Sequence, residues 1–188
     1  MAQTLMTTAA AILIATITLW FVSLARRDAS IADAFWGTGF VIVAWMAWWL
    51  NSPAVPRVLI LTGLTTAWGL RLSLFLLWRN MGHGEDRRYA AMRAHHAQRF
   101  WWVSLFTVFL LQGALLWFVS LPIQVAAAKN AATPLGWLDA AGIGVWAVGL
   151  FFETVGDWQL ARFKSNPSHA GQVMDRGLWR YTRHPNYF

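Results

Sequence analysis

Long apolar stretches separated by short polar segments dominate this chain. Five of the stretches reach about 20 residues, the length that a helix needs to cross the hydrocarbon core of a bilayer. They cover residues 6–25, 32–50, 58–78, 101–126 and 137–158. The pattern predicts an all-α transmembrane helix bundle in which residues 1–188 form a single domain.

Composition supports the same class of protein. Of the residues, 57% are hydrophobic and 12% are charged, against about 25% charged in an average soluble domain. Fourteen tryptophans fit aromatic belts at the two membrane interfaces. The first stretch has no basic region before it and no small-residue cleavage site, so it is expected to be a retained helix rather than a signal peptide. The chain has no cysteine, which excludes disulfides and thiolate metal sites.

Basic residues alternate between rich and poor loops. The first loop begins with two arginines, residues 79–100 hold five and residues 162–188 hold five cations, whereas the second and fourth loops hold Arg57 and Lys129 alone. By the positive-inside rule, the amino terminus lies outside and the first, third and fifth loops are cytoplasmic. This distribution accounts for the net charge of +7, so we expect no nucleic-acid partner.

A few charges lie within or at the ends of the predicted spans. Arg71 lies in the third span, where a charge costs roughly 2.5–3.5 kcal/mol, so it is expected to face an interior ion pair or ligand, with snorkelling as the alternative. Glu153 and Asp157 are four residues apart on one helix face. Either a cation such as Arg71 or a ligand lies between them. Asp33 opens the second span, where helix capping is the alternative to a catalytic role.

The third loop contains the string GEDRRY, residues 84–89. Arg88 and Tyr89 in this string can engage a phosphate and a ring, although a solvated charge run is the usual interpretation. The neighbours His95 and His96 point about 100° apart on a helix and have no evident third ligand, so we expect no metal site.

Two pairs of glycines lie inside apolar spans. Gly37 with Gly39, and Gly142 with Gly144, follow no predicted strand, which excludes a dinucleotide-binding turn. Close packing of helices is the better interpretation. Any nucleotide must therefore be held by loops and helix ends.

The last residues, 180–188, concentrate basic, amide and phenol side chains. Arg180 and Arg183 offer forked donors suited to phosphates, and Asn186 can pair with an amide. The remaining candidates are a phosphate donor and two phenols that can stack on a ring, namely His184, Tyr181 and Tyr187. Contact with anionic lipid is the alternative for this segment.

Residues 177–188, GLWRYTRHPNYF, resemble the signature of membrane-embedded steroid 5-alpha-reductases, sterol C14-reductases and isoprenylcysteine carboxyl methyltransferases. Four further motifs resemble the bacterial steroid 5-alpha-reductase-like membrane proteins: DAFWG (33–37), WGLRL (68–72), GEDRRY (84–89) and FETVGDWQLARFK (152–164). The resemblance covers essentially the whole chain. It implies a seven-helix bundle in the bacterial inner membrane. Five of those helices are present here, so the chain is expected to be incomplete at its carboxyl end.

The resemblance also implies roles for particular residues. In the reductases, NADPH enters from the cytoplasm, hydride reaches the β-carbon of an enone, and an acidic residue and a tyrosine polarise the ketone. Asp33 stands near the acidic residue, and Trp68 occupies the tyrosine position. The positions that match cofactor-contacting residues of these families are Asp157, Lys164, Arg180, Tyr181, Arg183, His184 and Asn186. From their own chemistry rather than from the resemblance, we predict that Tyr89 supplies the phenol and that Arg71, Arg88, Glu153 and Tyr187 also bind the cofactor.

Three functions follow as hypotheses. The first is NADPH-dependent reduction of a C=C bond in a steroid-like or other lipid-soluble substrate. The second is an isoprenylcysteine-type methyltransferase that uses S-adenosylmethionine, a cofactor without phosphates and therefore a poorer match to the arginines. The third is a lipid-binding membrane protein without catalysis. We expect the 188-residue chain by itself to lack reductase activity.

Overall fold

The computed structural model describes residues 1–51, 55–129 and 134–187, and within these ranges it contains helices and turns but no strand. Five helical stretches are long and apolar enough to cross a membrane: Ala2–Arg26, Ile31–Asn51, Pro56–Asn80, Arg87–Val119 and Trp137–Lys164. The predicted all-α, multi-pass membrane fold and the five predicted spans are therefore confirmed.

The chain divides into two compact units, Met1–Thr133 and Pro134–Phe188, and each is described here by itself. The single domain predicted from the sequence stays a prediction.

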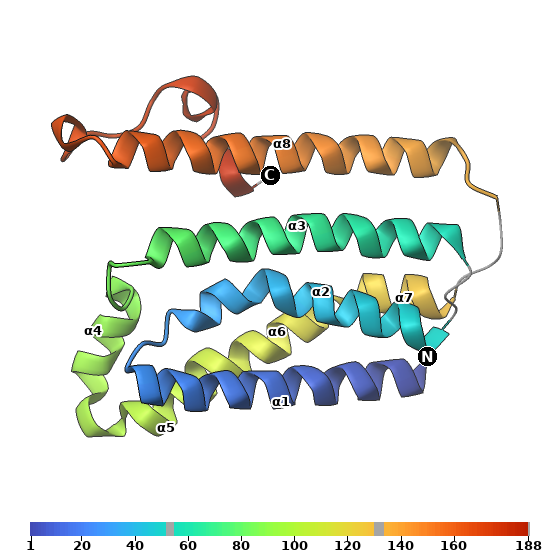
Figure 1. The fold of residues 1–188 in the computed structure, drawn as a ribbon, viewed down its shortest axis with the longest axis horizontal. Helices are drawn as coiled ribbons and strands as arrows, with labels where there is room; N and C mark the ends of the chain where they lie inside the picture. The colour runs from blue at the N-terminus through green and yellow to red at the C-terminus, as the bar shows by residue number, and fades with distance from the viewer. Residues whose placement is uncertain (52–54, 130–133, 188) are drawn as a thin grey trace. The chain divides into compact units, whose positions relative to one another are not determined.

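In the first unit, α2 (Ile31–Asn51) is the central helix (Figure 1). It packs against α1 (Ala2–Arg26) and α3 (Pro56–Asn80), and also against α6 (Leu111–Val119) and α7 (Leu121–Ala128). The shorter helix α4 (Arg87–His96) connects the end of α3 to α5 (Phe100–Ser104). The start of α2 therefore lies at the same end of the unit as α4.

Glycines bring α2 and α3 close together. A Cβ atom added to Gly37 would lie 2.2 Å from the carbonyl oxygen of Gly69, so only glycine permits this approach. Next to Gly37, the backbone N–H of Thr38 donates to Ser73 Oγ, one turn after Gly69 on α3, at 2.9 Å. The predicted close packing at Gly37 is confirmed. In the second unit, an added Cβ at Gly142 or Gly144 meets no described atom within 4 Å, so packing there stays a prediction.

The fourth span differs from the continuous helix predicted over residues 101–126. Its helical stretch begins at α4, turns at Ala97 with a positive φ of 45°, and contains a π-helical segment, Leu105–Leu110, between α5 and α6. It breaks again at Ser120, before α7. Pro122, in the first turn of α7, lacks an N–H and cannot continue the preceding helix, which explains that break.

The second unit consists of α8 (Trp137–Lys164) and the segment that follows it. This segment folds back onto α8 through short 3₁₀ turns, of which Gly177–Arg180 and Pro185–Tyr187 both contact the helix (Figure 1).

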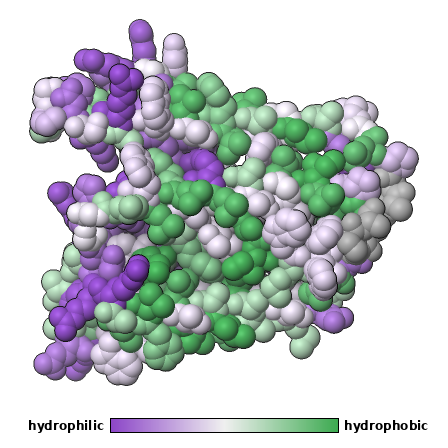
Figure 2. Space-filling view, in the orientation of Figure 1, coloured by the Kyte–Doolittle hydropathy of each residue, from purple (hydrophilic) through white to green (hydrophobic). Residues whose placement is uncertain are grey.

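Apolar side chains cover the flanks of the spans, and hydrophilic residues gather at the helix ends, for example over α4 (Figure 2). Ile14 on α1 is 66% exposed and Leu74 on α3 is 64% exposed. Such outward-facing aliphatic side chains suit contact with lipid tails rather than water.

Candidate functional site

Four polar side chains from three helices meet at the start of α2, and we call them the Asp33 cluster: Asp33, Arg88, Tyr89 and Gln112. The hydroxyl of Tyr89 donates to Asp33 Oδ1 at 2.5 Å, and Arg88 Nη2 donates to Asp33 Oδ2 at 2.5 Å. Gln112 Nε2 donates to the Tyr89 hydroxyl oxygen at 3.0 Å and lies 3.4 Å from Asp33 Oδ1. The two residues predicted as the catalytic pair are thus in direct contact.

The Asp33 cluster has a buried side and an exposed side. Tyr89 is 5% exposed and belongs to an apolar core that includes Phe100 and Phe109. The Asp33 side chain is 16% exposed, whereas that of Arg88 is 65% exposed. A small molecule can therefore approach the carboxylate from the side of Arg88, while the ring of Tyr89 is fixed by its packing.

The start of α4 fixes Arg88 and Tyr89 in place. Asp86 is the N-cap of α4, and its Oδ1 accepts from the backbone N–H of Arg88 at 2.9 Å and from Arg88 Nε at 3.0 Å. Such a cap satisfies backbone N–H groups of the first turn. The hydrogen bond from the Arg88 side chain is the main cause that lowers the pKa of Asp86 below its ordinary value.

Glu85 ties this loop to the turn before α2. Its carboxylate accepts from the backbone N–H of Ala29 at 2.9 Å and from Arg93 Nη2 at 2.7 Å and Nε at 2.8 Å. The backbone N–H of Asp86 adds a 2.7 Å bond to Ser30 Oγ. The GEDRRY string therefore holds α4 against the segment that carries Asp33, a positioning role that sequence reasoning did not assign to Glu85.

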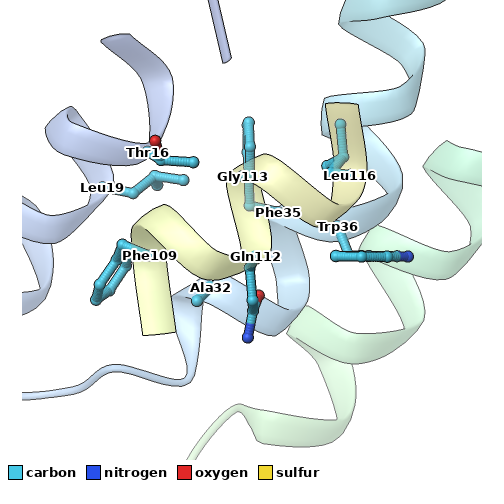
Figure 3. A pocket seen from close by; sticks show the side chains of 9 residues that line it. All are labelled: Thr16, Leu19, Ala32, Phe35, Trp36, Phe109, Gln112, Gly113 and Leu116. Carbon is cyan, nitrogen blue, oxygen red and sulfur yellow. The ribbon is translucent and has the colours of Figure 1, made fainter. Parts of the chain in front are cut away.

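Gln112 is a second residue of the site that was not predicted from the sequence. It is the second residue after the π-helical segment Leu105–Leu110, and π-helical turns inside α-helices occur frequently at functional sites. Gln112 lines a cavity of about 10 Å³ between α1, α2 and α6 (Figure 3), which is room for about one water molecule. The available signal was an uncharged polar residue inside an apolar span.

Two predicted residues of α3 lie apart from these contacts. Trp68, which the resemblance to the steroid reductases puts at the position of their tyrosine, packs edge-on against Phe40, with ring centroids 5.5 Å apart. The phenol of this site therefore comes from α4 and not from α3. Arg71 is half-buried on α3. Its predicted pairing with Glu153 or Asp157 stays a prediction, because those residues belong to the other unit.

In the second unit, the predicted residues Asp157 and Asn186 are brought together. Asn186 Nδ2 donates to Asp157 Oδ1 at 3.0 Å, and Asn186 Oδ1 is buried without a hydrogen bond from any described residue. The indole N–H of Trp179 donates to the carbonyl of Gly156 at 3.0 Å. We call residues 177–187 the terminal string. Its uncharged residues Trp179 and Asn186 thus attach it to α8.

The charged and phenolic members of the terminal string lie at the surface. His184 and Tyr187 stack with centroids 5.2 Å apart, and both are exposed. Glu153 is half-buried, one turn before Asp157. The remaining predicted residues, Lys164, Arg180, Tyr181 and Arg183, are exposed, and Phe188 lies outside the described residues. Their predicted convergence on a cofactor stays a prediction.

No group of three or more His, Cys, Asp or Glu side chains suited to a metal ion occurs among the described residues. The rings of His95 and His96 stand almost perpendicular, at 84°.

Comparison with known proteins gives a family without an assigned activity. The family model described as a protein of unknown function, DUF1295, matches residues 19–188, and the chain therefore belongs to this family. No curated protein and no solved structure matches the chain.

Proposed function

We propose that this protein is a membrane reductase that transfers hydride from NADPH to a C=C bond conjugated with a carbonyl group in a lipid-soluble, steroid-like substrate. The observation that carries the proposal is the contact between the Tyr89 hydroxyl and the Asp33 carboxylate at 2.5 Å. An acidic residue paired with a phenol is the group that the resembling steroid reductases use on a ketone.

The Asp33 cluster has the chemistry that enone reduction requires. When hydride adds to the β-carbon, the π electrons move to the carbonyl oxygen, which then needs a hydrogen-bond or proton donor. The Tyr89 hydroxyl donates to Asp33 Oδ1 and accepts from Gln112 Nε2, and it becomes the donor to the carbonyl when the substrate oxygen replaces the Asp33 oxygen as its acceptor. Arg88 holds the Asp33 carboxylate in place through its bond to Oδ2. The α-carbon then takes one proton, so enone, NADPH and a proton give the saturated ketone and NADP⁺.

Two observations in the second unit support a dinucleotide as the hydride source. The buried Asn186 Oδ1 is an acceptor without a partner among the described residues, which suits a carboxamide N–H. The exposed Arg180 and Arg183 offer charged donors of the kind that bind phosphates. NADPH, when bound, supplies the hydride, and these residues bind and orient it.

The test is binding followed by turnover. The protein is reconstituted in nanodiscs and titrated in parallel with NADPH and with S-adenosylmethionine. We expect binding of NADPH alone, and oxidation of NADPH, followed at its nicotinamide absorbance, when a steroidal enone is added.

Two other binding results would contradict the proposed reductase activity. Binding of S-adenosylmethionine alone favours the methyltransferase hypothesis. Binding of neither cofactor favours a lipid-binding protein without catalysis.

A further inference from the structure

An open groove of about 420 Å³ lies in the second unit, between the end of α8 and the segment that follows it. Its volume falls in the range of ligand pockets, about 300–1,000 Å³. The residues that line it were not among those predicted from the sequence to bind a cofactor. They include Trp158, Gln159, Arg162, Phe163, His169 and Arg176.

Cationic and neutral donors line one side of the groove. Arg162 and Arg176 contribute forked guanidinium donors. Gln159 Oε1 accepts from the backbone N–H of Leu178 at 3.0 Å, which fixes the amide and leaves its NH₂ group as a donor. His169 Nδ1 lies 3.1 Å from the carbonyl oxygen of Phe163 and donates to it, so Nε2 is an acceptor in the neutral ring and donates to a ligand only in the imidazolium form.

Aromatic rings hold two of these side chains in place. The guanidinium of Arg162 lies over the ring of Trp158, 5.5 Å from its centroid. The ring of His169 stacks on Phe163, with centroids 4.3 Å apart and planes 11° apart. Such stacking orders long side chains before a ligand arrives. It also offers a flat apolar surface beside the donors.

Among the residues that the structure describes, no carboxylate lines the groove. Asp175 precedes the lining residue Arg176 in the chain, its Oδ1 is 4.0 Å from Arg176 Nε, and the two side chains are 81% and 75% exposed. An exposed pair at this distance contributes little and does not neutralise the arginine. The groove therefore has a positive character that favours an anionic ligand.

We propose that this groove is an anion site that takes a phosphate group. Planar guanidinium forks and an amide N–H match the tetrahedral oxygens of a phosphate. The adjoining rings suit a base or sugar attached to it. The phosphate can belong to a soluble nucleotide or to the headgroup of an anionic lipid, because the groove follows directly after a membrane-spanning helix. The site does not depend on the proposed reductase activity.

The test removes the two arginines and compares both sources of phosphate. The protein in zwitterionic nanodiscs is titrated by calorimetry with pyrophosphate and with 2′,5′-ADP. In a second arm, nanodiscs contain phosphatidylglycerol, and bound lipid is counted by native mass spectrometry. The variant is Arg162→Gln with Arg176→Gln. The matched control, Arg26→Gln with Arg99→Gln, removes the same charge from exposed positions outside the groove.

We expect the groove variant to lose about tenfold or more in affinity, while the control binds as wild type does. Loss of pyrophosphate and 2′,5′-ADP binding identifies a soluble ligand, and selective loss of phosphatidylglycerol identifies a lipid. Either result supports the site. Equal binding by both double variants overturns it, and so does the absence of binding to any of these probes. NADPH oxidation that persists in the groove variant separates this site from the proposed catalytic one.

Discussion

The Asp33 cluster and the terminal string, residues 177–187, are both rich in charge, but they are held in opposite ways. The Asp33 carboxylate accepts hydrogen bonds from Arg88, Tyr89 and Gln112, and Tyr89 lies in an apolar core. The terminal string makes hydrogen bonds to α8 through Leu178, Trp179 and Asn186, while its arginines extend into solvent.

This difference separates preorganised groups from groups that are ordered by a ligand. A reacting group gains most from a geometry that is fixed before the substrate arrives. Cations that bind a mobile, multiply charged ligand can remain free until it docks, at a cost in side-chain entropy. This difference supports the proposal that the first region carries the chemistry and the second captures the ligand.

The largest expected effect is on catalysis in the Asp33 cluster. Tyr89→Phe removes the proton donor and keeps the ring in its core, so we expect turnover of an enone to fall about 100-fold or more. Stability should fall by about 2–3 kcal/mol, because the buried hydroxyl makes two hydrogen bonds and one of them is to a carboxylate. The matched control is Thr18→Val, which removes an exposed hydroxyl that lies outside both regions. Equal turnover in the Tyr89 variant and wild type would remove the phenol from the mechanism.

The second effect concerns the attachment of α4. Glu85→Ala deletes the acceptor of three hydrogen bonds, from Ala29 and from Arg93, so we expect the free energy of unfolding to fall by about 2–3 kcal/mol. Denaturant unfolding in detergent micelles, followed by tryptophan fluorescence, measures it. A double-mutant cycle with Arg93→Ala should show coupling between the two residues.

The pair Asp175 and Arg176 is the control for that cycle. Its atoms are 4.0 Å apart and exposed, so coupling should stay below about 0.5 kcal/mol. Similar coupling energies in the two cycles would contradict the contrast between the two regions.

A smaller effect is expected where the terminal string attaches to α8. Asn186→Ala removes the bond to Asp157, which contributes about 1 kcal/mol, so local opening of the string should become about fivefold more frequent. Trypsin cleavage after Arg180 and Arg183, followed over time by mass spectrometry, reports that opening. His184→Ala, at an exposed position, should leave the cleavage rate unchanged. A string that is cut equally fast in both variants is not held by Asn186.

The sequence was informative wherever one property recurs along the chain. Hydropathy located all five spans, because a helix in a bilayer must be apolar over its whole length. The breaks in the fourth span were harder to find. Ala97 carries no turn signal, and a π-helical segment of apolar residues has the same composition as an α-helix. Pro122 was the available signal for the break at Ser120, but the predicted span continued through it to residue 126.

The candidate site was predictable in part for a similar reason. Asp33 and Tyr89 belong to motifs of unusual composition, so the sequence was enough to predict them as site residues. Their contact depends on the turn at residues 28–30 and the loop at 84–86, whose hydrogen bonds hold α4 against α2. Gln112, which contacts both, lies just after a π-helical segment, and hydropathy does not reveal such a segment. In the terminal string, the predicted binding residues included the arginines because of their charge. The hydrogen bonds that attach the string to α8 come instead from Trp179 and Asn186.

The smallest expected effect is the dependence of the α4 cap on pH. Because Arg88 lowers the pKa of Asp86 in the folded protein below the ordinary value of 3.8, the charged carboxylate contributes stability at pH values above that value. The contribution is lost as the pH falls through the lowered pKa. Asparagine also caps helices, so Asp86→Asn isolates the charge, with an expected cost below about 1 kcal/mol. Thermal unfolding of wild type and variant should differ at pH 6 and converge as the pH falls below 3.8. Asp175→Asn, in the exposed part of the second unit, should show no such convergence. A difference between wild type and Asp86→Asn that does not change with pH would mean that the charge of Asp86 does not contribute to the stability of the cap.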